Sequence, residues 1–404
     1  MKISALAPGL GAWLVVCGAL PALADEVKGP EVKGPEVKSP EASGIKWLLA
    51  NQLPSGGWGQ GEESMEMGRG LQLKSTANVA DTSIAVLALL RSGSSPKAGP
   101  HSAAAARGIE FILGEIEAAD ADSMSVTRVT GTRVQTKLGP YIDTFMAAAL
   151  LPELEGKMPD GKAEGRLGKA TAKVLLKMRK NQAQDGRFET GGWAPTLAQA
   201  MATRGINVAA RNGIAVDEGM RQRAEKYATQ GATAAGGPAA TEGSAGVGLY
   251  AAASTVSQMQ QSAGTDTKLV DKAKDDLAHA KTPAQKKEAE ARLDSYRAAD
   301  EVQAHATDRL VGQINDPAFV SGFGSNGGEE FLSYMLIAES LRSKHAKDFQ
   351  QWEAGMVRNL TRVQNGDGSW TGHHCITGRT FCTAAALLVL MADRAPVAHQ
   401  EKAS

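Results

Sequence analysis

Apolar residues recur every three to four positions through most of residues 41–395, and this spacing predicts α-helices. The same region is rich in residues that favour helices, such as Ala, Leu, Met, Lys, Glu and Gln, and it has few alternating β-branched runs. The segments richest in Ala and Leu are predicted to be the most buried helices, at 81–90, 141–150, 197–205, 245–258, 329–341 and 381–390. The pattern therefore predicts an all-α fold.

Two segments depart from this pattern. Residues 125–134 carry β-branched side chains on both sides of Gly131, which predicts a short β-hairpin. Residues 265–312 are heavily charged with sparse apolar positions, and Pro283 divides them, which predicts a charged helical hairpin that projects into solvent. A charged surface of this kind is typical of a solvated face, and the alternative is a docking arm for a partner protein.

One sequence pattern occurs three times, each time where a predicted amphipathic helix ends. It consists of a glutamine, three residues, a glycine, one residue and an aromatic ring, and a second helix follows after a variable loop. The glutamine is expected to bond free carbonyls at the end of the preceding helix, the glycine to allow a positive φ, and the ring to pack against a neighbouring repeat. The copies are Gln52, Gly56 and Trp58; Gln182, Gly186 and Phe188; and Gln364, Gly368 and Trp370.

These copies resemble the QW repeats of the squalene cyclase and protein prenyltransferase superfamily, and the first copy also carries Trp47 and Leu48 ahead of Gln52. The resemblance covers most of residues 41–395 and implies an α/α toroid of about six inner and outer helix pairs. It implies, as one functional alternative, a divergent terpenoid cyclase-like or prenyltransferase-like enzyme that acts on an isoprenoid or lipid. The Asp-x-Asp-Asp cluster with which class II cyclases protonate an alkene is absent, and no catalytic residue is assigned.

The first 40 residues predict export. Lys2 is followed by an uncharged stretch that ends in a small-x-small pattern at Ala22 and Ala24, so residues 1–24 are predicted to be a signal peptide. Residues 25–40 contain three Glu-Val-Lys-Gly/Ser-Pro pentads, which predict a solvated tether. The toroid domain is predicted at 41–395 and a short tail at 396–404. The mature protein is expected in the periplasm or outside the cell, without a transmembrane segment.

The charge balance narrows the choice of partner. The chain has 44 Lys and Arg residues against 44 Asp and Glu residues, and it has no dense basic segment. Nucleic-acid binding as the main function is therefore excluded, because phosphate neutralisation requires a positive field. The remaining candidates for a partner are a protein or a hydrophobic or other small-molecule ligand.

The richest cluster of reactive side chains lies around the loop that follows the third repeat. His373, His374 and Arg379 are candidates for a cationic patch that binds an anionic group, although each histidine alone is more typical of a surface loop. After export, Cys375 and Cys382 are the only cysteines, which predicts a disulfide that closes this loop. Zinc bound by His373, His374, Cys375 and Cys382 is the less favoured alternative, because the spacing of these residues is not a standard zinc pattern. No cofactor is expected otherwise.

Further candidates lie at the starts of the predicted buried helices. The candidates for ligand binding at the mouth of the expected cavity are Tyr141, Asp143 and Glu329. Asp143 has a second possible role, which it shares with Asp81, as a carboxylate that stabilises the first turn of a helix. Glu329 and Glu330 follow a glycine-rich loop at 319–328 and would repel phosphate there. Taken together, the sequence favours a non-catalytic protein that holds a ligand or partner in its central cavity or on its loop face.

Overall fold

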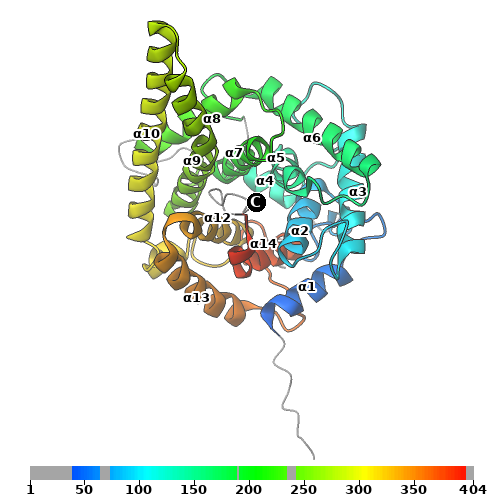
Figure 1. The fold of residues 1–404 in the computed structure, drawn as a ribbon. Coiled ribbons are helices and arrows are strands. Elements are labelled where there is room, and N and C mark those ends of the chain that lie inside the picture. The colour runs from blue at the N-terminus through cyan, green and yellow to red at the C-terminus, as the bar shows by residue number, and fades with distance from the viewer. Residues whose placement is uncertain (1–38, 64–72, 189–190, 234–242, 397–404) are drawn as a thin grey trace, which may run out of the picture. The chain divides into compact units, whose positions relative to one another are not determined.

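The chain is mostly helical in the residues that the structure describes, which are 39–63, 73–188, 191–233 and 243–396. The structure is a computed structural model, shown in Figure 1. The predicted signal peptide lies outside the described residues, as do nearly all of the tether and of the C-terminal tail. The described helices belong to one compact unit, Ser39–Ser404. The prediction of an all-α fold is confirmed.

The helices are numbered in chain order. In order they are α1 (Pro40–Ala50), α2 (Val79–Arg91), α3 (Ser102–Ala118), α4 (Arg133–Leu138), α5 (Ile142–Leu150), α6 (Gly161–Asn181), α7 (Pro195–Arg211), α8 (Glu218–Thr233), α9 (Gly248–Ala278), α10 (Pro283–Val311), α11 (Pro317–Val320), α12 (Gly328–Lys344), α13 (Ala346–Val363) and α14 (Arg379–Leu390). Two 3₁₀ segments, Leu151–Leu154 and Ala392–Arg394, follow α5 and α14. None of the described helices is both long enough and apolar enough to cross a membrane.

Six of these helices contact one another in a closed cycle. α2 packs against α5, α5 against α7, α7 against α9, α9 against α12, α12 against α14, and α14 against α2. They are the six helices that the Ala- and Leu-rich segments predicted, and α2, α5, α7 and α14 are buried along nearly their full length. Helices that are apolar on all sides need neighbours on all sides, and the cycle together with the surrounding helices provides them.

The other long helices lie outside this cycle, as Figure 1 shows for α1, α3, α6, α8 and α13. Three of them bridge two members of the cycle: α8 packs on α7 and α9, α13 on α12 and α14, and α1 on α14 and α2, whereas α3 packs on α2 and α6 on α5. Each of these helices buries one stripe of side chains and exposes its opposite side to solvent. On α13 the buried stripe consists of Phe349, Trp352, Met356 and Leu360. The amphipathic helices predicted ahead of the three repeats therefore form the outside of the fold.

The three repeats make the same hydrogen bonds. The side-chain nitrogen of each glutamine donates to the carbonyl of its own glycine and to a carbonyl in the first turn or two of the next outer helix. The second set of acceptors is Ala104 on α3 for Gln52, Met220 on α8 for Gln182, and Pro40 on α1 for Gln364, at 2.9, 3.1 and 2.9 Å. The third bond joins residues 324 positions apart and links the last repeat to the first helix.

The two tryptophans of the repeats have the role that was predicted for the glutamines. The indole nitrogens of Trp58 and Trp370 donate to Leu48 and Leu360, which are carbonyls near the end of their own outer helices, at 2.8 and 2.9 Å. The expectation that the glutamine bonds these carbonyls is therefore wrong, because the glutamine reaches forward to the next helix. The backbone N–H of each aromatic residue also donates to an inner helix, at Thr82, Gln199 and Thr383 for Trp58, Phe188 and Trp370.

The glycine of each repeat requires its backbone conformation. Gly56, Gly186 and Gly368 have φ of 89°, 94° and 92°. A Cβ atom at any of the three would lie within 2.6 Å of a carbonyl oxygen on the next outer helix. The glycine therefore allows both the turn and the close approach of two helices.

The predicted β-hairpin at 125–134 is not present. Residues 125–132 have neither helix nor strand structure, and Arg133 begins α4. Thr132 and Gln135 form a capping box that starts this helix, and the Gln135 side chain also donates to the Val129 carbonyl at 2.8 Å. The β-branched residues therefore do not decide the local structure, because side-chain caps satisfy the backbone instead of a strand partner.

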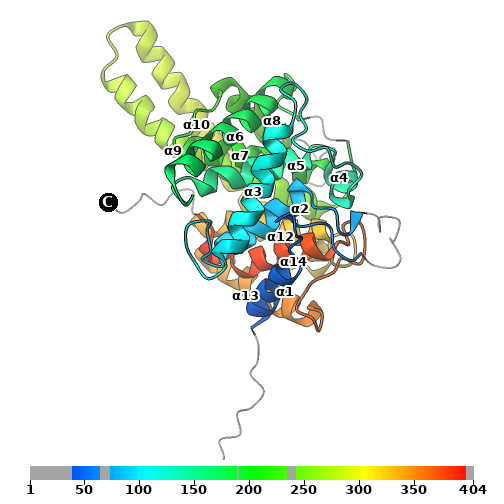
Figure 2. The same cartoon turned by 90° about the vertical axis from the view of Figure 1, so that its right-hand side faces the viewer.

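The charged segment forms the predicted helical hairpin. α9 and α10 pack against each other, and Thr282 and Gln285 form a capping box at the start of α10, with Pro283 in its first turn. Figures 1 and 2 show the far ends of both helices extending beyond the other helices. The first half of α9 is buried as a member of the cycle, whereas the second half is largely exposed.

Candidate functional site

The starts of the six buried helices lie at the same end of the unit. Asp143 on α5 accepts the backbone N–H of Ala80 on α2 at 2.9 Å, and Thr196 on α7 donates to Ser254 on α9 at 2.9 Å. The Tyr250 hydroxyl at the start of α9 donates to Glu330 at the start of α12. The loops before the helices meet at this end, which we call the loop face.

Asp81 and Asp143 lie beneath the loop face and are fully buried. The second oxygen of Asp143 accepts a hydrogen bond from Gln135 at 2.7 Å, and Asp81 is bonded to its capping residue Asn78 at 2.6 Å. Burial raises the pKa of Asp143 to about 6 and that of Asp81 to about 7. Asp143 joins two helix starts inside the fold, so of the two roles considered for it the structural one fits these contacts.

Glu329 and Glu330 are also buried, at the start of α12. Glu329 accepts the backbone N–H of Ile376 at 3.1 Å, and its other oxygen has no hydrogen-bond partner. Burial, together with the neighbouring Glu330, raises the pKa of Glu329 to about 8. At neutral pH this carboxyl group is therefore mostly protonated and can donate a hydrogen bond.

Glu330 organises the glycine-rich loop above it. Its carboxylate accepts the backbone N–H groups of Phe323 and Gly327 at 3.0 and 2.9 Å, in addition to the Tyr250 hydroxyl. The His374 Nε2 atom lies 3.4 Å from the same carboxylate and 2.6 Å from the Ser325 carbonyl oxygen, to which it donates. One buried carboxylate therefore fixes the positions of the loop and of the histidine.

Two aromatic side chains are exposed on the loop face. Phe323 is 53% exposed and Trp193 is 41% exposed, and their rings meet edge to face with centroids 5.8 Å apart. The His374 ring lies 5.3 Å from Phe323, and the Lys137 ammonium lies 5.1 Å from the centre of the Trp193 ring. We call Trp193, Phe323 and His374 the aromatic cluster. Exposed rings held next to each other are typical of a binding surface, because water solvates them poorly.

The backbone around the aromatic cluster is anchored. The N–H of Ala194 donates to the Lys137 carbonyl at 2.8 Å, which ties the Trp193 loop to α4. The N–H of His373 donates to Asn326 at 2.8 Å, which ties the loop after the third repeat to the glycine-rich loop. These hydrogen bonds tie residues beside the rings to neighbouring elements, which lowers the entropic cost of binding there.

The candidate cationic patch is not formed as predicted. Arg379 is engaged by Asp367 at 2.6 Å and lies 3.7 Å from Glu62, beside a small cavity of about 230 Å³ next to Trp47. His373 is exposed, whereas His374 faces Glu330 and Phe323. The two carboxylates neutralise Arg379, so only His374 of the three belongs to the aromatic cluster. Tyr141, another candidate, is the N-cap residue of α5 and packs, partly buried, against the core.

The predicted disulfide is not formed either, since Cys375 and Cys382 are both free and buried. The Cys382 thiol points to the Ile376 carbonyl at 3.4 Å, while Cys375 has a φ of 54° and a thiol close to Lys137 and Glu329. The two sulfur atoms therefore have different neighbours. Burial and the charge of Glu329 raise the pKa of Cys375 to about 11, so its thiol is protonated at neutral pH.

The zinc alternative gains no support from the geometry. Across the part of the chain that the structure describes, no three His, Cys, Asp or Glu side chains come together in a way that would hold a metal ion. His374 is engaged by Ser325 and Glu330, and Cys382 by Ile376.

The inside of the helix cycle is crossed by buried ion pairs. Arg91 on α2 pairs with Glu153 after α5 at 2.7 Å, and Glu153 pairs with Arg204 on α7 at 3.0 Å. Arg204 also pairs with Glu339 on α12, although α7 and α12 are not neighbours in the cycle. All four side chains are at most 9% exposed. This network, which we call the interior ion network, places charged side chains between α2, α7 and α12.

Sequence reasoning missed Trp193, Phe323 and Lys137. A signal was present, because Trp193 follows Gly191 and Gly192 and Phe323 lies between two glycines, and rings in glycine-rich loops rarely belong to a core. Comparison of the chain with known protein families, curated proteins and solved structures finds no match.

Proposed function

We propose that this chain is an exported, non-catalytic binding protein, built as an α/α toroid, that holds an apolar group of a ligand or protein partner on its loop face. The observation that carries the proposal is the aromatic cluster: two half-exposed rings and a histidine, held by anchored loops above the buried carboxylate of Glu330. Aromatic side chains on a rigid support are the residues that contribute most to binding interfaces.

The toroid part of the proposal rests on two observations. Six buried helices contact one another in a closed cycle, and each repeat bonds to the next outer helix, including the bond from Gln364 back to α1. A cycle closed by the last repeat on the first helix is what an α/α toroid requires.

The enzyme alternative, acting on an isoprenoid or lipid, has less support. Such a substrate needs an apolar cavity inside the helix cycle, and the interior ion network places charged side chains there. A turnover assay with isoprenoid diphosphates tests this alternative directly, and product formation would overturn the non-catalytic proposal.

Site-specific photocrosslinking tests the loop face. A photoreactive phenylalanine analogue replaces Phe323 in the exported protein, and the crosslinked species is identified by mass spectrometry. Val357 on α13 is the matched control position, since it is also a large exposed apolar residue, at 39%, but lies on an outer helix. We expect a discrete adduct from position 323 that is absent from position 357 and is reduced by Trp193→Ala. Equal adducts at both positions, or adducts unaffected by Trp193→Ala, would contradict the proposal.

A further inference from the structure

Lys137, in the last turn of α4, places a positive charge beside the aromatic cluster. Its side chain is partly exposed, and its ammonium lies 5.1 Å from the centre of the Trp193 ring. The ammonium lies near the Cys375 thiol but, among the residues that the structure describes, it forms no ion pair with a carboxylate. An ammonium group has three donors, so Lys137 can still donate to an anionic group that arrives from solvent.

The buried Glu329 interacts with Lys137 but does not neutralise it. Glu329 is 0% exposed, and one of its two side-chain oxygens has no hydrogen-bond partner. An ionised carboxylate is unfavourable in such a place, and the pKa of Glu329 is accordingly raised to about 8, mainly by burial. The group is therefore mostly protonated at pH 7. Lys137 thus keeps a positive charge that this neighbour does not balance.

Trp193 connects this charge to the apolar part of the loop face. Its ring contacts the Lys137 ammonium and also meets the Phe323 ring, with the two ring centroids 5.8 Å apart. Both rings are about half exposed. A single small ligand can therefore pack on the rings and place a polar group at Lys137.

From this arrangement we propose that the loop face selects small ligands in which a carboxylate lies next to an apolar body, and that Lys137 determines this selectivity. The inference rests on the proposed function, because it concerns the same surface. The carboxylate accepts a charge-assisted hydrogen bond from Lys137, and the apolar body packs against Trp193 and Phe323. A neutral ligand gains only the apolar contact, and a cationic ligand is repelled by Lys137.

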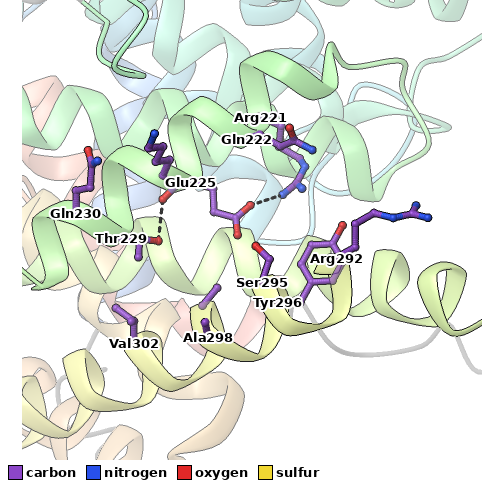
Figure 3. A pocket seen from close by; sticks show the side chains of 12 residues that line it. Arg221, Gln222, Glu225, Thr229, Gln230, Arg292, Ser295, Tyr296, Ala298 and Val302 are labelled. Carbon is purple, nitrogen blue, oxygen red and sulfur yellow. Dashed lines mark hydrogen bonds and ion pairs between the residues drawn. The ribbon is translucent and has the colours of Figure 1, made fainter. Parts of the chain in front are cut away.

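A cavity of about 540 Å³ between α8 and α10 is a competing place for an anion (Figure 3). It is lined by three cations, Arg221, Lys226 and Arg292. Arg221 already pairs with Glu225 at 3.0 Å, and Arg292 already pairs with Asp276 at 3.1 Å. Lys226 is exposed there, so Lys226→Met is the matched control for the loss of one positive charge.

NMR titration of isotope-labelled protein comprising residues 25–404 tests the inference. Phenylacetate is the anionic probe, and phenylacetamide is a neutral probe of the same shape. The indole N–H signal of Trp193, assigned with Trp193→Phe, reports binding at the loop face. We expect both probes to shift this signal saturably, with a Kd at least about fivefold lower for phenylacetate. Lys137→Met is expected to remove the preference, whereas Lys137→Arg and Lys226→Met should retain it.

The outcomes separate this inference from the proposed function. Circular dichroism checks that each variant is folded. An equal Kd for the two probes, a preference that persists in folded Lys137→Met, or one that is lost in folded Lys226→Met would overturn the selection of a carboxylate by Lys137. Apolar binding at the loop face would still stand in these cases. A Trp193 signal that neither probe shifts would also overturn the inference, and crosslinking from position 323 then tests the proposed function independently.

Discussion

Replacing Glu153 by glutamine is the most direct perturbation of the interior ion network. Glu153 lies between Arg91 and Arg204 and is 2% exposed, so Glu153→Gln preserves the shape of the side chain while two buried guanidinium groups lose their shared carboxylate. Breaking a buried ion pair by removing one partner costs about 3–5 kcal/mol, because an uncompensated charge stays in a region of low dielectric. The variant is therefore expected to unfold at markedly lower urea concentration.

The pKa of Glu153 gives a second estimate of this magnitude. Burial opposes ionisation, but Arg91 and Arg204 together lower the pKa of Glu153 from 4.5 to about 2. A decrease of this size corresponds to about 3 kcal/mol of stabilisation of the ionised form. Because the pKa of the folded state is below the unfolded value, the contribution is complete above about pH 4.5 and is lost as the pH falls toward 2.

Urea unfolding of the wild type, Glu153→Gln and Glu155→Gln, followed by circular dichroism, measures the effect. Glu155 is two positions away and exposed, so its replacement controls for the loss of a charge at the same turn. We expect a loss of about 3 kcal/mol or more for Glu153→Gln at pH 7, a smaller loss near pH 3, and less than about 0.5 kcal/mol for Glu155→Gln. A loss below about 1 kcal/mol for Glu153→Gln at pH 7 would refute the argument that the network stabilises the interior.

Three further measurements check other parts of the structure. Gly186→Ala is expected to destabilise the fold by about 2 kcal/mol or more, because Gly186 has a φ of 94° and the new Cβ would lie 2.0 Å from a carbonyl oxygen. The control Gly165→Ala, in open space on α6, should stabilise the fold by about 0.5–1 kcal/mol. Urea unfolding compares the two variants, and similar effects would contradict the role of the repeat glycine. The pKa of Glu329 is raised to about 8 in the folded state, so its contribution to stability is fully present below about pH 4.5 and is lost as the pH rises through 8. Glu329→Gln should therefore gain stability relative to the wild type between pH 6 and 9. If the difference in melting temperature between the two proteins stays constant over this range, the raised pKa is excluded. Thiol titration of unreduced protein comprising residues 25–404 should find Cys375 and Cys382 unreactive when the chain is folded and both reactive in denaturant. The absence of a reactive thiol in denaturant would restore the disulfide prediction.

Local signals explain which parts of the fold the sequence predicts. The spacing of apolar residues along α2, α5 and α14 and the three Gln-Gly-aromatic copies depend on neighbouring positions, so the helices and the repeated junctions are found without knowing the tertiary structure. The prediction of a β-hairpin at 125–134 is wrong for the opposite reason. Its β-branched residues favour a strand, but the bond between Gln135 and Asp143, eight positions away, belongs to a contact that local propensity does not describe.

The candidate site was harder to predict because its parts come from distant segments. Trp193, Phe323 and His374 belong to three different loops, and Lys137 belongs to a fourth element, so no spacing along the chain connects them. The disulfide prediction counted cysteines correctly, but it had no information on where the two thiols point. The interior ion network left a weak signal, since Arg204 and Glu339 each lie among apolar and small neighbours in the sequence.

The position of the exposed Phe323 ring depends on Glu330, which is fully buried. Glu330 is buried, yet its carboxylate accepts the backbone N–H of Phe323 and lies 3.4 Å from His374, while the Tyr250 hydroxyl holds it from α9. A change at Glu330 would therefore release both an exposed ring and the histidine beside it, even though it alters no exposed atom. Burying a carboxylate is unfavourable by itself, and the hydrogen bonds that Glu330 accepts offset that cost. The same hydrogen bonds fix the loop. The burial of Glu330 is thus explained by the loop that it orders, and this links the helix starts beneath the loop face to the surface that we propose binds a partner.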